Sequence, residues 1–195
     1  MKPFSQACEN NKQPILDKLR DCFANQTNVI EIGSGTGQHA VHFAQHLPHV
    51  IWQTSDLAEN HAGINAWIGD TNLSNLRAPM ELDVNDSRWD IHPCDAVFTA
   101  NTLHIMSWRE VEKLFKHLDK ILTENGCLVV YGPFNYEGKF TSESNERFNQ
   151  WLREQAPHRA IRDFEAVCAL ASSIGLTLQN DFGMPANNRL LYFSR

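Results

Sequence analysis

Three alternate glycines, Gly33, Gly35 and Gly37, stand between an apolar run and a helical pattern. Glycine lets a chain turn sharply and lets its backbone approach a ligand without a Cβ atom in the way. The following helix presents free N–H groups at its start, which can bind polar ligand atoms. A plain strand-to-helix turn needs one or two glycines, so three in register favour a ligand-binding turn.

The residues after the turn separate the ligand classes. A dinucleotide fingerprint G-x-G-x-x-G requires glycine where this chain has Gln38, which disfavours a nicotinamide cofactor. No Lys-Ser or Lys-Thr pair follows the turn, so a phosphate-binding P-loop is excluded. The predicted ligand therefore lacks a pyrophosphate, and a nicotinamide-dependent oxidoreductase is the less favoured alternative.

Three carboxylates accompany the glycine turn. Asp56 follows the second apolar run, where a carboxylate can accept two hydrogen bonds from a ribose diol; a solvated or helix-capping role is the alternative. Asp83 follows a third run and can accept from an adenine amino group, or it forms a turn. Glu31 lies inside the first run, where an unpaired carboxylate is costly, so a ligand ammonium group or a network within the fold must satisfy it.

Two other groups of polar residues have chemical potential. His42 and His46 stand at i and i+4, the spacing of paired metal ligands, but no third ligand accompanies them. A helix face explains this pair, and no metal site is predicted. The segment Asn101-Thr102-Leu103-His104 follows another apolar run and can reach a ligand; the alternative is a loop in which Thr102 or Ser107 caps the next helix.

The elements that must position these residues alternate between short β-branched runs and longer helical patterns. This alternation predicts the α/β class, with a parallel sheet flanked by helices. The expected strands are 29–32, 50–54, 78–82, 94–100, 127–131, 176–182 and 190–193. The expected helices are one after Pro14 and those at 40–47, 61–68, 108–122, 145–154 and 164–173.

Single residues predict some boundaries. Asn125-Gly126 is expected to end the helix 108–122 in a left-handed turn, Asp163 to cap the helix 164–173, and Gly175 to end it. The irregular stretch from Pro133 to Ser144 leaves the fifth strand at the edge where open α/β sheets bind ligands. That stretch is therefore a candidate lid.

The formal net charge of -6 and the pI near 5.8 disfavour nucleic acid as a partner, since such domains carry clustered Lys and Arg. No apolar run approaches the roughly 20 residues that cross a bilayer, and the first residues lack a hydrophobic signal segment. We expect one domain over residues 1–195, a cytoplasmic location and no membrane partner. The oligomeric state is not predicted.

The motifs together resemble those of class I S-adenosylmethionine-dependent methyltransferases. The resemblance rests on Glu31-x-Gly33-x-Gly35-x-Gly37, Asp56, Asp83 and the run from Asp95 to Asn101. Four segments look more narrowly like an uncharacterised methyltransferase-like family shared by bacteria and animals: Asn11-Lys12-x-Pro14-Ile15-Leu16, Ser34-Gly35-x-Gly37-Gln38-His39, Tyr131-Gly132-Pro133 and Met184-Pro185-Ala186-Asn187-Asn188.

This resemblance implies a Rossmann-like fold with helices on both faces of a seven-stranded, mostly parallel sheet, in the order 3-2-1-4-5-7-6 with strand seven antiparallel. It implies S-adenosyl-L-methionine as cofactor, bound by Glu31, Gly33, Ser34, Gly35, Gly37, Asp56, Leu57, Asp83, Val84 and Asn101. The implied function is methyl transfer to an unknown small-molecule acceptor. A non-catalytic module that binds S-adenosylmethionine is the alternative.

An acceptor pocket is expected beside the cofactor, lined by uncharged polar groups that orient a ligand without a buried net charge. Its predicted residues are Asn11, Asn101, His104, Tyr131, Asn135 and Asn187. Asn101, His104 and Tyr131 are the catalytic candidates, of which the latter two can exchange protons. Two structural alternatives stay open, because Asn11 can cap the first helix and Asn187 can stabilise the last turn.

Overall fold

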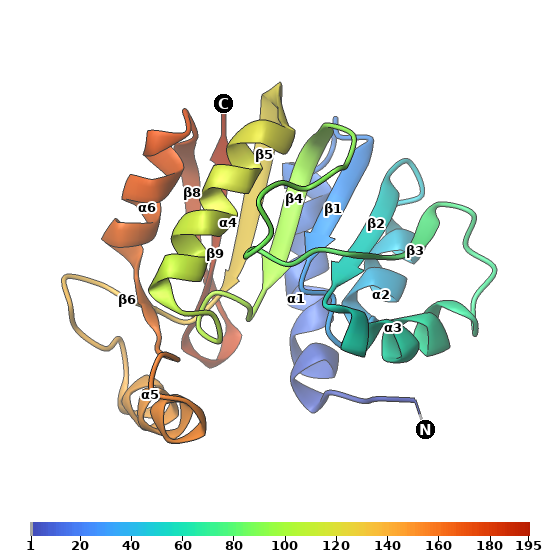
Figure 1. Cartoon of the computed structure of the whole chain (residues 1–195). Helices are drawn as coiled ribbons and strands as arrows, with labels where there is room; N and C mark the ends of the chain where they lie inside the picture. Colours follow the sequence, from blue (N-terminus) through green and yellow to red (C-terminus); the bar gives the residue numbers. More distant parts are fainter. Residues whose placement is uncertain (1) are drawn as a thin grey trace.

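The computed structural model describes residues 2–195, in which a large sheet lies between two layers of helices (Figure 1). Its seven strands run in the spatial order β3-β2-β1-β4-β5-β9-β8, and all neighbours are parallel except the two pairs that β9 makes. The bounds are β1 Asn28–Ile32, β2 Ile51–Asp56, β3 Leu76–Glu81, β4 Cys94–Ala100, β5 Leu122–Gly132, β8 Thr177–Met184 and β9 Asn188–Ser194. The predicted fold class and strand order are confirmed, with β8 and β9 as the sixth and seventh long strands.

Alternation along the strands divides the core in two. In β1, Val29 packs with the helices of one face, whereas Ile30 and Ile32 pack with those of the other. Helices α1 and α2 cover the first face, α4 and α6 cover the second, and α3 packs beside β3 (Figure 1). The helix bounds are α1 Gln6–Cys22, α2 Gln38–His46, α3 His61–Ile68, α4 Trp108–Ile121, α5 Glu143–Gln155 and α6 Phe164–Ser173.

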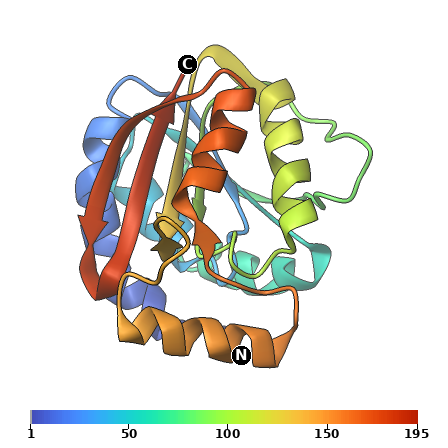
Figure 2. The ribbon, with the colours of Figure 1, turned by 90° about the vertical axis from the view of Figure 1, so that its left-hand side faces the viewer.

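Helix α5 lies apart from both faces, across the carboxyl ends of the strands (Figure 2). Two short strands, β6 Phe134–Asn135 and β7 Arg162–Asp163, pair in parallel and flank the chain's excursion through α5. Within residues 2–195, no helix is both long enough and apolar enough to cross a membrane.

Helix α1 starts much earlier than the sequence predicts. It begins after Ser5, whose side chain accepts a hydrogen bond from the Cys8 N–H, and Pro14 lies inside it. The expectation of a helix after Pro14 is therefore wrong about the start, and so is the alternative that Asn11 caps it. The loss of one backbone hydrogen bond at Pro14 is tolerated because Ile15 and the apolar residues that follow it are buried.

The predicted left-handed stop at Asn125-Gly126 is wrong. Helix α4 ends at Ile121, and β5 begins at once with Leu122 pairing to Cys94 before the register shifts. The side chain of the C-terminal Arg195 binds the carbonyl oxygens of Asp119 and Leu122, so the helix end needs no glycine turn.

Helix α6 has its predicted ends. Asp163 stands at the N-cap position, although its side chain makes no capping hydrogen bond, and Gly175 follows the helix with a positive φ. The strand at 94–100 and the helices at 61–68 and 164–173 have the bounds expected from the sequence.

Candidate functional site

A cavity of about 550 Å³ lies at the carboxyl ends of β1 to β4. We call it the strand-end cavity, and its lining includes residues from each predicted cofactor motif. Of the predicted cofactor residues, those that line it are Gly33, Gly35, Asp56, Leu57, Asp83, Val84 and Asn101. Glu31, Ser34 and Gly37 are buried and do not line it.

The three glycines of the turn have different reasons to be glycine. All three have positive φ, the conformation that L residues rarely adopt. A Cβ atom on Gly33 would lie 2.8 Å from the Thr102 Oγ1 atom, and one on Gly37 would lie 3.1 Å from the Ile64 Cα atom. A Cβ atom on Gly35 would meet nothing within 4 Å. Packing therefore demands Gly33 and Gly37, while Gly35 borders open space in the cavity lining.

Asp56 ties the end of β2 to the glycine turn. Its Oδ2 atom accepts a hydrogen bond of 2.7 Å from the Gly35 N–H. Its Oδ1 atom accepts bonds of 2.8 Å from the Leu57 N–H and from the Asn60 side-chain amide. A carboxylate offers about four acceptor sites, so roughly one is left for a ligand hydroxyl instead of the two expected for a ribose diol.

Asp83 forms a turn and also lines the cavity. Its Oδ1 atom accepts a hydrogen bond of 2.8 Å from the Asn85 N–H, which makes it a turn-forming residue. Its backbone carbonyl accepts a bond of 2.8 Å from the Trp89 indole, which fixes the turn against the core. No hydrogen bond within residues 2–195 uses its Oδ2 atom.

Glu31 is satisfied within the fold. Its Oε2 atom accepts hydrogen bonds of 2.9 Å from the Ser34 hydroxyl and 3.1 Å from the Trp52 indole. The side chain is 1% exposed, and this burial raises its pKa to about 7 despite the two bonds. Of the two predicted roles, the hydrogen-bond network is the one that these contacts favour, and Glu31 braces the glycine turn from behind.

Asn101 and His104 lie close together beside β5, but only Asn101 lines the strand-end cavity, and His104 is buried. Asn101 adopts a positive φ, and its N–H bonds the Tyr131 carbonyl at 2.9 Å. A Cβ atom on Gly132 would lie 3.8 Å from the Asn101 Oδ1 atom and 3.9 Å from the His104 Nδ1 atom. Burial lowers the pKa of His104 to about 4, assisted by the charges of Arg162 and Arg159, so its imidazole is neutral at pH 7.

Asn11 and Tyr131 are buried and line neither this cavity nor the pocket described next. The Asn11 Oδ1 atom lies 2.6 Å from the Nε2 atom of His39, whose pKa is lowered to about 4 by burial. Burial raises the pKa of Tyr131, and hydrogen bonding with Asn11 and Asn188 opposes that rise. These side chains meet each other, whereas Tyr131 contacts Asn101 through its backbone carbonyl.

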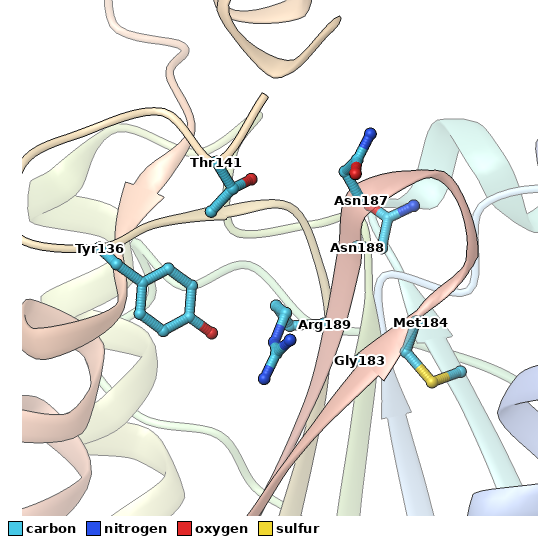
Figure 3. Close-up of a pocket in the computed structure, with 7 residues that line it drawn as sticks. All are labelled: Tyr136, Thr141, Gly183, Met184, Asn187, Asn188 and Arg189. Atoms are coloured by element: carbon cyan, nitrogen blue, oxygen red, sulfur yellow. The ribbon is translucent and has the colours of Figure 1, made fainter. Parts of the chain in front are cut away.

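A pocket of about 370 Å³ lies between the turn that joins β8 to β9 and the chain that leaves β6; we call it the hairpin pocket. Figure 3 shows Tyr136 and Thr141 on one side and the hairpin residues on the other. Its lining is Tyr136, Thr141, Gly183, Met184, Asn187, Asn188 and Arg189. Asn187 bonds the Ser144 hydroxyl at 3.1 Å, and the nearby stretch predicted as a lid contributes to this pocket instead of the strand-end cavity.

The sequence reasoning missed several residues of the strand-end cavity. Those with polar or flexible side chains are Glu59, Asn60, Asn85, Met106, Glu110, His158 and Arg159. Glu110 carries a detectable signal, because it forms a capping box with Ser107 at the start of α4. Arg159 has no such local sequence signal. It follows α5, and only the tertiary fold brings it to the cavity. Asn135 was predicted for the acceptor side, and its Oδ1 atom is buried without a partner among residues 2–195.

His42 and His46 contact each other and the helix backbone. Their rings lie 4.5 Å apart, and the Nδ1 atom of His46 bonds the His42 carbonyl at 2.8 Å. Among residues 2–195, no group of three or more His, Cys, Asp or Glu side chains is placed to hold a metal ion.

The strand order, the antiparallel β9 and the glycine turn at the end of β1 define the class I methyltransferase fold. Solved structures share it. An O-methyltransferase family protein from Burkholderia thailandensis superposes with a TM-score of 0.85 at 19% identity, covering 97% of this chain and 57% of that one. Human N-acetylserotonin methyltransferase, solved in complex with S-adenosylmethionine, superposes with a TM-score of 0.82 at 14% identity. The match covers 97% of this chain and 53% of the human one. Mitomycin 7-O-methyltransferase superposes with a TM-score of 0.77 at 14% identity, and the match covers 89% of this chain and 50% of that one.

The chain thus spans about half the length of the methyltransferases it resembles, between 50% and 57%. The chain belongs to the family described as "Protein of unknown function (DUF938)", whose model matches residues 2–195.

Proposed function

We propose that this chain binds S-adenosylmethionine in the strand-end cavity and transfers its methyl group to a small-molecule acceptor. The observation that carries the proposal is the convergence of motifs from four strand ends on one cavity. Its volume of about 550 Å³ lies within the roughly 300 to 1,000 Å³ of small-molecule sites. We further propose that residues 1–195 act as one domain in the cytoplasm.

The lining suits the parts of this cofactor. The remaining acceptor site of Asp56 fits a ribose hydroxyl, and the Oδ2 atom of Asp83 fits an adenine amino group. Leu57 and Ile105 also line the cavity, and each is 42% exposed. A flat aromatic base would cover such apolar surface and gain the associated free energy.

When bound, S-adenosylmethionine would supply a methyl group attached to a positively charged sulfur, so that the thioether S-adenosylhomocysteine is a good leaving group when the acceptor takes that methyl group. The task of the chain is then to hold the acceptor in line, and such alignment is worth several kcal/mol. His104 is neutral at pH 7 and can take a proton from an acceptor at a ring nitrogen. Asn101, held in its left-handed conformation at the end of β4, can orient the acceptor through its amide.

Two observations support a small-molecule acceptor. The net charge of -6 disfavours a nucleic-acid backbone. The structurally similar N-acetylserotonin and mitomycin methyltransferases are named after small-molecule acceptors.

Calorimetry with S-adenosylmethionine and its product S-adenosylhomocysteine tests the binding step. The wild-type protein is expected to bind both with micromolar affinity, about 8 kcal/mol. Gly35→Arg should abolish binding without unfolding the protein, because the space beside Gly35 is open. Gly175→Arg is the matched control, since Gly175 also has positive φ and open space but follows α6. Absence of binding by the wild type, or unchanged binding by folded Gly35→Arg, would refute the assignment.

Transfer is tested separately from binding. Incubation with methyl-labelled S-adenosylmethionine and a protein-free cell extract should give a labelled small molecule. Binding without any transfer, in that extract and in one containing macromolecules, would support the alternative of a non-catalytic module. Tight binding of a nicotinamide dinucleotide in place of S-adenosylhomocysteine would support the oxidoreductase alternative.

A further inference from the structure

One strong cation lies on the strand-end cavity. Arg159 is the only Lys or Arg among the residues of the described chain that line it, and the neighbouring His158 lines it too. The other ionisable lining residues are the acids Asp56, Glu59, Asp83 and Glu110. The cavity therefore offers a ligand several negative groups and a single arginine.

Within residues 2–195, the guanidinium of Arg159 makes no hydrogen bond or ion pair. Its Nε atom is buried and makes no hydrogen bond within residues 2–195, and no carboxylate of those residues lies within ion-pair distance of it. An unpaired buried donor on a charged group costs more free energy than a neutral one. An incoming anion would remove this cost.

Arg162, in the same segment, shows what a structural arginine looks like here. It donates 3.0 Å and 3.1 Å bonds to the carbonyls of Leu103 and His158, and a further bond to the Met106 carbonyl. These bonds fasten the segment after α5 to the loop after β4. Arg159 lies in that fastened segment yet uses its Nε for nothing within it.

Backbone contacts fix where Arg159 stands. The Ala160 N–H bonds the His104 carbonyl at 3.0 Å, and the Arg159 N–H bonds the Ala156 carbonyl at 3.0 Å. Arg159 is therefore held next to the loop 101–106, from which Asn101, Thr102, Ile105 and Met106 also line the cavity.

We propose that Arg159 is the carboxylate-binding residue of the strand-end cavity. A guanidinium presents parallel N–H donors that match the two oxygens of a carboxylate. The four acids on the same lining would repel a doubly charged phosphate, so a single negative charge fits. The carboxylate comes either from the amino-acid tail of S-adenosylmethionine or from the acceptor, and this inference rests on the proposed function.

The first measurement compares two ligands by calorimetry. S-adenosylhomocysteine has the amino-acid tail, and methylthioadenosine lacks it. If the tail is the source, Arg159→Gln should weaken S-adenosylhomocysteine binding by about tenfold or more and change methylthioadenosine binding less than about twofold. Arg159→Lys keeps the charge but loses the two parallel N–H donors, so its affinity for S-adenosylhomocysteine should lie between those of the wild type and Arg159→Gln. Arg153→Gln, an exposed arginine of α5, is the control and should bind like the wild type.

The second measurement tests the other source. If the acceptor carries the carboxylate, Arg159→Gln should bind S-adenosylhomocysteine normally, and acetate should bind the loaded wild-type protein but not the loaded variant. Unchanged S-adenosylhomocysteine affinity together with equal acetate titrations of both proteins would overturn the inference. Should the wild type bind no S-adenosylhomocysteine, the proposed function fails, and acetate titration of the free proteins still decides the role of Arg159.

Discussion

The polar residues at the carboxyl ends of β1 to β4 meet in one cavity, whereas those near the ends of β5 and β8 lie in separate places. At the first set, seven predicted cofactor residues meet on one cavity. At the second set, Tyr131 is buried against Asn11 of α1, whereas Asn187 lines the hairpin pocket. Residues directly at parallel strand ends share an edge of the sheet. Tyr131 lies inside β5 and packs into the core on the α1 and α2 face, whereas Asn187 lies on the connection between β8 and β9.

The largest expected effect tests how tightly the first region is built. Gly33→Ala should destabilise the protein by about 3 kcal/mol, since it combines a left-handed alanine with overlap against Thr102. Urea unfolding measures this change. Adding Thr102→Ala should recover part of the loss because it removes the overlapping hydroxyl. Gly175→Ala, left-handed but in open space, should lose less. Equal losses at the two glycines, without recovery in the double variant, would contradict this account of the turn.

The next effect concerns the buried carboxyl of Glu31. Its folded-state pKa of about 7 exceeds the ordinary 4.5, so the folded state holds the proton more tightly and stability falls as pH rises between these values. Relative to Glu31→Gln, the wild type should lose about 2 kcal/mol of unfolding free energy between pH 5 and 7.

This difference isolates Glu31 from the buried histidines. The lowered pKa values of His39 and His104 make stability fall as pH drops from about 6.5 toward 4, which is the opposite sign. Both histidines are present in the two proteins, so their contribution cancels. A pH-independent difference between wild type and Glu31→Gln would show that Glu31 is ionised throughout.

A smaller effect compares one residue from each region. Asp56→Ala should weaken S-adenosylhomocysteine binding about tenfold, roughly 1.4 kcal/mol, through loss of a ligand contact and of the bond that holds Gly35. Asn187→Ala should leave that affinity unchanged because Asn187 lines the other pocket. Calorimetry of both variants measures these affinities. An equal loss of affinity in Asn187→Ala would contradict the assignment of the two residues to separate sites.

The smallest effect separates neighbours across β4 and β5. Tyr131→Phe should cost about 1 kcal/mol of stability, the value of a buried hydrogen bond, and leave S-adenosylhomocysteine affinity unchanged. Asn101→Gly keeps the left-handed backbone and removes the amide, so it should weaken binding or transfer with little loss of stability. The reverse pattern, with Tyr131 controlling binding, would place the acceptor beneath α1.

The limits of the sequence prediction follow the same division. The α/β class and the glycine turn were predictable because apolar alternation and glycine spacing are local signals. The strand order was not encoded in such a signal and followed from the resemblance to class I methyltransferases. The role of Glu31 was left between two possibilities, since Trp52 reaches it from the neighbouring strand. Arg159 was missed because the fold brings it to the cavity through α5, and no local pattern encodes that route.

Helix α5 buries few apolar side chains. Its buried residues are Asn145, Asn149 and Leu152, whereas α4 buries an apolar stripe. Side-chain amides hold it: Asn145 bonds the Asn187 carbonyl, and Asn149 accepts from the Ile161 N–H. A helix retained by a few polar bonds opens at lower free energy than one packed into the core. Hydrogen exchange should therefore be faster in α5 than in α4, which would let molecules enter and leave the edge of the sheet while the sheet itself stays folded.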